Sequence, residues 1–84
     1  MPPESILSRL ADALRLAIEE HGAPNTFHPH ELANYHPRLN RLLIGRAMQD
    51  VRARAELQDR IKHNIAYVPS AERGYMCVLV GVRR

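Results

Sequence analysis

The stretch from residue 38 to residue 57, RLNRLLIGRAMQDVRARAEL, most constrains the fold, because it is twenty residues long and contains no proline. Good helix formers such as leucine, arginine, alanine, methionine and glutamine dominate it. The spacing predicts one helix with a core-facing apolar stripe, made of Ile44, Ala47, Met48, Val51 and Ala55. The opposite side carries Arg38, Gly45, Arg46, Gln49 and Ala53, with Arg41 and Arg52 on its flank. We therefore expect one buried side and one guanidinium-rich side toward solvent.

Positive charge is segregated along the chain. Residues 1–37 contain two arginines and five acidic residues, a net charge of −3, whereas residues 38–84 contain ten lysines and arginines and four acidic residues, a net charge of +6. The two parts add up to the formal charge of +3. Such asymmetry is typical of a protein that binds nucleic acid through one face. The alternative interpretation is a solvated arginine-rich helix without a partner.

The length of 84 residues predicts a single domain covering residues 1–84. The single cysteine, Cys77, has no partner for an internal disulfide and lies in an apolar setting that predicts a buried thiol. No apolar run is long enough for a membrane span, and the N-terminus does not resemble a signal peptide. We therefore expect a cytoplasmic protein with no membrane partner.

A first helix is predicted to begin at Pro2-Pro3-Glu4-Ser5 and to end at His21-Gly22. Its apolar arc spans roughly 200°, twice the width that one core face needs. The members of this arc are Ile6, Leu7, Leu10, Ala13, Leu14, Leu16, Ala17 and Ile18.

The other elements are shorter. Residues 26–28 form a candidate strand stub, and a short helix is predicted to begin at Pro29 and to end before Pro37. Strands are predicted over residues 61–68 and 75–82, joined by the turn-rich segment 69–74 as a hairpin. The last strand, YMCVLVGV, is apolar on both faces.

This α+β order, α-β-α-α-β-β, resembles the winged helix-turn-helix superfamily. The matching segments are FHPHELANY as the short helix, RLNRLLIGRAMQDVRARAEL as the recognition helix, and IKHNIAYV with YMCVLVGV as the wing. The resemblance implies that the recognition helix lies in the major groove and that the wing, residues 61–82, touches the adjacent backbone. It also implies that the strand stub pairs with the last strand, which becomes the middle of the sheet. Leu39 and Leu42 depart from this pattern, because they lie toward the side expected to be exposed; either they pack under the short helix or the long helix begins later.

Double-stranded DNA is the partner that this resemblance implies. Arg38 and Arg41 would enter the groove first, and arginine and glutamine side chains such as Arg46 and Gln49 can read guanine and adenine edges. Asn40 either reads a base or caps the helix, with the cap favoured. The candidates for backbone phosphate contacts are Arg52, Lys62 and Arg73, with Arg73 at the tip of the wing loop.

The wide arc of the first helix and the two-faced last strand suggest a homodimer acting as a small transcription regulator. The alternative function is a protein-binding winged helix that acts as an adaptor or inhibitor of a larger assembly. His28, His30, Glu31 and His36 lack the ligand spacing of a zinc site, so no metal or other cofactor is expected. The sequence contains no nucleophile motif and no pair of carboxylates in an arrangement typical of an active site, so we do not expect an enzyme.

Overall fold

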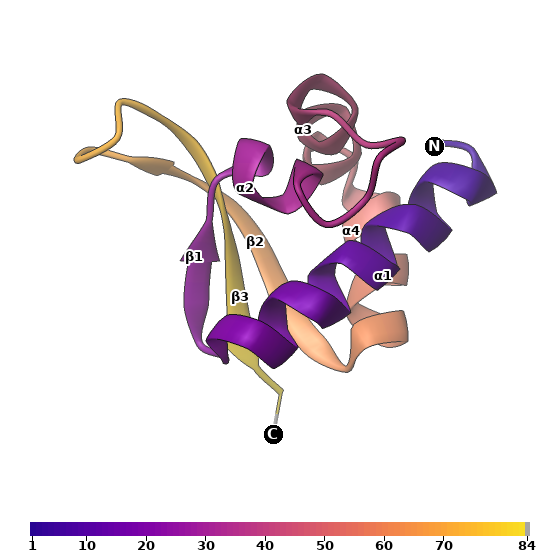
Figure 1. The fold of residues 1–84 in the computed structure, drawn as a ribbon, viewed down its shortest axis with the longest axis horizontal. Helices are drawn as coiled ribbons and strands as arrows, with labels where there is room; N and C mark the ends of the chain where they lie inside the picture. Colours follow the sequence, from indigo (N-terminus) through magenta and orange to yellow (C-terminus); the bar gives the residue numbers. More distant parts are fainter. Residues whose placement is uncertain (84) are drawn as a thin grey trace.

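The structure is a computed structural model that describes residues 1–83. Within these residues, four helices and a three-stranded antiparallel sheet form the fold (Figure 1). The predicted α+β class is confirmed, and the layout is consistent with a winged helix. The predicted order is wrong by one helix, because the expected helix 38–57 is two helices. In chain order the elements are α1 Glu4–His21, β1 Asn25–Phe27, α2 Pro29–Ala33, α3 Arg41–Gln49, α4 Val51–Ile61, β2 His63–Ser70 and β3 Tyr75–Val82.

Helix α1 ends at His21 as predicted, because Gly22 takes a φ of 80°, which favours glycine. Its apolar arc is wide because α2, α3 and α4 all pack against it. The protein's own core therefore accounts for most of the arc, and α1 no longer argues for a dimer. The buried residues of α1 are Leu7, Leu10, Ala11, Ala13, Leu14 and Ala17.

The predicted helix 38–57 breaks at Asp50, which has the extended angles φ −88° and ψ 116°. The Asp50 carboxylate accepts hydrogen bonds from the backbone N–H groups of Arg52 (2.9 Å) and Ala53 (3.1 Å). Asp50 is therefore the N-cap of a new helix, a role for which aspartate is favoured. The Arg54 guanidinium also donates to the backbone oxygen of Met48 at the end of α3.

The break changes which side chains of the second half face inward. Val51 was expected in the core but is 70% exposed, and Ala55 is exposed as well. Ala53, expected toward solvent, is fully buried. Leu43, next to the core-facing Ile44, is half-buried. The new stripe of α4 consists of Ala53, Leu57 and Ile61.

Helix α3 begins at Arg41, three residues later than expected. Leu39 precedes the helix and is buried, whereas Leu42 is exposed. Of the two explanations offered for these leucines, the later start of the helix is confirmed, and Leu39 lies in the core ahead of it. Arg38 therefore lies before α3 and not in its first turn.

The sheet has the strand order β1-β3-β2, so β3 is central as expected. Phe27 of β1 lies opposite Val78, and Tyr67 of β2 lies opposite the same residue on the other side. The hairpin is confirmed, but β2 begins at His63 and not at residue 61. The first two residues expected in the strand instead end α4, with Lys62 in the left-handed conformation.

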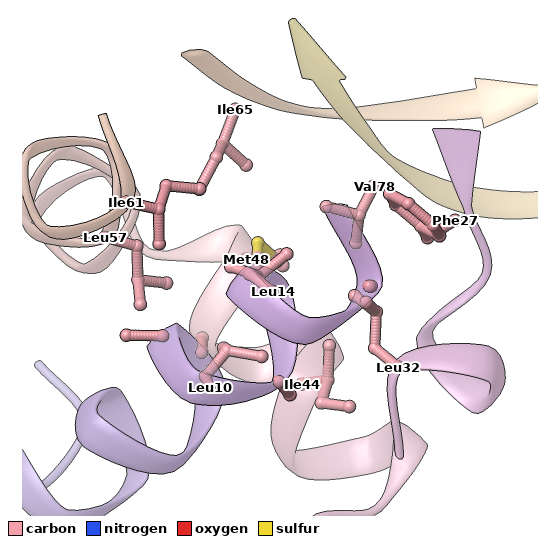
Figure 2. Packing of buried hydrophobic residues seen from close by; sticks show 14 of the residues in the cluster. Leu10, Leu14, Phe27, Leu32, Ile44, Met48, Leu57, Ile61, Ile65 and Val78 are labelled. Atoms are coloured by element: carbon pink, nitrogen blue, oxygen red, sulfur yellow. The ribbon is translucent and has the colours of Figure 1, made fainter. Parts of the chain in front are cut away.

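The core lies between the helices and one face of the sheet (Figure 2). It draws side chains from every element, and the large fully buried ones include Leu10, Leu14, Leu32, Ile44, Met48, Leu57 and Val78. This shared core fixes α3 beside the hairpin.

Candidate nucleic-acid interface

Helix α3 presents a polar face opposite its core face. Ile44, Ala47 and Met48 point into the core, while Arg41, Arg46 and Gln49 are exposed. The Asn40 side chain accepts a hydrogen bond from the Leu43 N–H at 2.9 Å, which is the capping role of the two roles considered for it. The cap and the core contacts together fix the orientation of α3 about its own axis, and so determine which side chains face outward.

The arginines of this face are not neutralised by neighbouring carboxylates. Among residues 1–83, Arg38, Arg41, Arg46 and Arg52 take part in no ion pair. Other arginines of the chain do have acidic partners, including Arg15, Arg60, Arg73 and Arg83. The α3 surface therefore has uncompensated positive charge that an anionic partner can neutralise.

A groove of about 510 Å³ runs between α3 and the tip half of the hairpin. The Tyr67 hydroxyl meets α3 at Gly45, where a β-carbon would come within 3.3 Å of its oxygen. Glycine thus allows the hairpin to approach the helix backbone closely at this point. Burial raises the pKa of Tyr67, so its hydroxyl stays protonated at neutral pH. The lining residues are His28, Pro29, Arg41, Leu42, Gly45, Arg46, Gln49, Tyr67, Tyr75 and Met76.

The hairpin tip is attached to the start of α2. Arg73 forms an ion pair with Glu31, and the ring of Tyr75 lies against that of His28 with 4.0 Å between centroids. His28 and Glu31 also form a capping box, in which the His28 N–H donates to Glu31 at 3.2 Å. Burial alone would raise the pKa of Glu31, but the hydrogen bonds from Arg73 and His28 bring it below its ordinary value. A charged carboxylate therefore holds the tip beside the groove.

The structure brings together only part of the predicted set. Arg41, Arg46 and Gln49 line the groove, and Arg38 lies just before α3. Arg52 is exposed at the start of α4. Lys62 lies where α4 joins β2, the whole length of β2 away from Arg73 at the tip.

Sequence reasoning missed the hairpin side of the groove. Tyr67, Tyr75 and Met76 line it together with His28. The available signal was Gly45 in the middle of a helical pattern, which indicates that another part of the chain approaches closely. The sequence did not show which part.

No family model matches the sequence, and no similar curated protein or solved structure was found.

Within residues 1–83, no group of three or more histidine, cysteine or acidic side chains is placed to hold a metal ion. In the same range, every helix is too short or too polar to cross a membrane.

Proposed function

We propose that this chain binds double-stranded DNA as a small regulator, with the exposed face of α3 in the major groove and the hairpin 63–82 against the adjacent backbone. The observation that carries the proposal is the outward face of α3, where Arg41, Arg46 and Gln49 project without acidic partners in the described chain. An α-helix with its side chains is about 10–12 Å across, which suits a major groove about 12 Å wide.

Contacts with bases and contacts with phosphates would contribute differently to binding. Arg46 can donate a fork of hydrogen bonds to guanine, and Gln49 can pair with the edge of adenine. Arg38 and Arg52 lie outside the groove between α3 and the hairpin. Their guanidinium groups suit phosphate oxygens, and such contacts supply affinity without sequence preference. Lys62 lies at the junction of α4 and β2, at the opposite end of β2 from the hairpin tip, so the proposed interface does not include it.

A protein partner is the second candidate, and one observation favours it. Leu42 lies among the arginines of α3 and is 62% exposed. An apolar side chain at the centre of a charged face is typical of a protein-binding surface, although it can also contact a thymine methyl group. In this reading the chain is an adaptor or inhibitor without a DNA role.

The test is fluorescence anisotropy with a labelled DNA duplex of mixed sequence, titrated with salt. We expect binding that weakens at least ten-fold between about 50 and 200 mM salt, because each phosphate contact releases counterions. The double variant Arg41→Ala/Arg46→Ala should weaken binding and reduce the salt slope.

The matched control is Arg15→Ala/Arg83→Ala, which removes the same charge. Arg83 directly follows Val82 at the end of β3, and this end of β3 lies on the side of the molecule away from α3 in Figure 1. The control should bind nearly as well as the unchanged protein. Equal losses in both double variants would indicate a general charge effect, and absence of binding at low salt would reject the DNA proposal in favour of the protein partner.

A further inference from the structure

We propose that the groove between α3 and the hairpin holds one unpaired nucleobase of the bound DNA, with the Tyr75 ring as its stacking surface and Gln49 or Arg46 at its edge. This inference rests on the proposed function, because the same basic face brings the nucleic acid to the groove. It adds a ligand, a single extrahelical base, that duplex binding by α3 does not require.

The shape and size of the groove suit such a ligand. Its volume of about 510 Å³ falls in the range of sites that take small organic molecules, about 300–1,000 Å³. It is closed on one side where the Tyr67 hydroxyl meets Gly45 of α3. Pro29 and Met76 add apolar surface beside the rings.

The aromatic side chains have no role in reading a paired base. Within a duplex the faces of the bases are covered by their neighbours, so an aromatic ring can stack only on a base that has left the helix. Tyr75 is 46% exposed in the groove wall, and the imidazole of His28 packs against its ring at a centroid distance of 4.0 Å. The contact with His28 holds the Tyr75 ring in place, so little freedom remains to be lost when a base stacks on it.

The polar side chains of the groove complement this surface. Gln49 offers both donors and an acceptor, as the edge of a nucleobase requires, and the guanidinium groups of Arg41 and Arg46 suit base acceptors or the phosphate of the same nucleotide. An extended apolar peptide would leave these groups unpaired. Ring, amide and guanidinium groups in one groove therefore favour a nucleotide.

The experiment compares two DNA duplexes that differ by one unpaired 2-aminopurine, using the intact protein. We expect the bulged duplex to bind at least about five-fold more tightly, the smallest effect usual for one stacked base. Binding should also quench the 2-aminopurine fluorescence, because the base becomes stacked on an aromatic ring.

The decisive pair of variants is Tyr75→Leu and Tyr75→Phe. Both variants remove the hydroxyl group, but only phenylalanine keeps the aromatic ring. Tyr75→Leu should lose the preference for the bulge and the quenching, and Tyr75→Phe should keep both, with the preference measured for each variant as its affinity for the bulged duplex relative to the paired one. Thermal unfolding of each variant checks that the fold is intact.

The outcomes separate this inference from the proposed function. Binding to the paired duplex that depends on Arg46, without any preference for the bulge, would overturn the inference and leave the proposed function standing. The same holds if both Tyr75 variants behave alike. Binding to the bulged duplex alone would support base binding in the groove and overturn the proposed binding of α3 to a paired duplex. Binding to neither duplex would overturn both proposals.

Discussion

At the scale of single residues, Lys62 shows how one backbone conformation ends a helix. Its angles, φ 60° and ψ 35°, are left-handed, and its N–H donates to the Gln58 oxygen at 2.9 Å. The chain can then turn from α4 directly into β2. Lysine is strained in this conformation, whereas glycine or asparagine adopts it more readily.

Lys62→Gly should therefore stabilise the fold. Relief of the left-handed conformation contributes about 1–2 kcal/mol, and the greater freedom of unfolded glycine costs about 0.5–1 kcal/mol, so the net gain should be about 0.5–1 kcal/mol. Urea unfolding measures the difference, and Lys62→Asn serves as a second variant without the charge. Neither variant should weaken DNA binding; a marked loss in both would return Lys62 to the interface.

At the scale of elements, the break at Asp50 decides which side chains form the core. After the break, Leu57 is fully buried while Val51 is 70% exposed. A continuous helix through residue 57 would keep Val51 on the stripe of Ile44 and Met48. Asp50 therefore rotates α4 relative to α3 and brings Leu57 to α1.

Leu57→Ala should destabilise the protein by about 2–5 kcal/mol, because it leaves a cavity in the core. Val51→Ala should change the free energy of unfolding by less than about 0.5 kcal/mol, because its side chain is largely in solvent. Urea unfolding of the two variants provides the comparison. A large loss for Val51→Ala would indicate a continuous helix after all.

Helix α2 has a titratable cap. The His28 Nδ1 accepts a hydrogen bond from the His30 N–H at 3.0 Å, so this nitrogen must carry no proton. Burial lowers the pKa of His28 below 6.5, assisted by His30, Arg73 and Arg41, although Glu31 acts in the opposite direction. Protonation would remove the acceptor and with it the cap.

The stability of the protein should therefore depend on pH through His28. Because the folded-state pKa lies below the unfolded one, this contribution is fully present above pH 6.5 and is lost as the pH falls through the lowered folded pKa. His28→Asn keeps a capping oxygen that does not titrate, so it should lose less stability on acidification. Thermal unfolding from about pH 7.5 to pH 5 measures this; parallel curves for the two proteins would exclude His28 as the cause.

At the scale of the whole molecule, the Arg73–Glu31 ion pair joins the hairpin tip to α2 and so sets one wall of the groove. The predicted wing contact is thus already bonded within the protein. Arg73 still has an exposed part, so a phosphate can share its guanidinium group with Glu31.

Arg46→Ala should reduce the preference for a selected site over random DNA, whereas Arg73→Ala should weaken binding to both alike. Glu31→Gln serves as the control for Arg73, because it breaks the ion pair and leaves the guanidinium free. If Arg73 contacts phosphate, Glu31→Gln should retain binding. Anisotropy with both DNAs measures these effects; equal losses on both for Arg46→Ala would contradict a base-reading role.

The predicted homodimer now depends on the last strand alone. Leu79 and Val82 of β3 remain exposed, while the arc of α1 is mostly covered within the chain. Sedimentation equilibrium of the protein with and without Leu79→Glu tests this prediction, because a charge at that position would separate two copies that pack there.

Local chemistry determined much of this protein. Proline and glycine set the limits of α1 and α2, and the apolar run 75–82 placed β3 correctly, because these signals act within a few residues. The side of α3 that carries Arg41, Arg46 and Gln49 also followed from periodicity alone. Only the tertiary structure decided the break at Asp50. Good helix formers lie on both sides of this residue, so the sequence pattern did not distinguish a capping aspartate from one inside a continuous helix. The tertiary structure alone also joined Tyr67 to Gly45 and Arg73 to Glu31, because contacts between residues far apart in sequence depend on how the whole core packs.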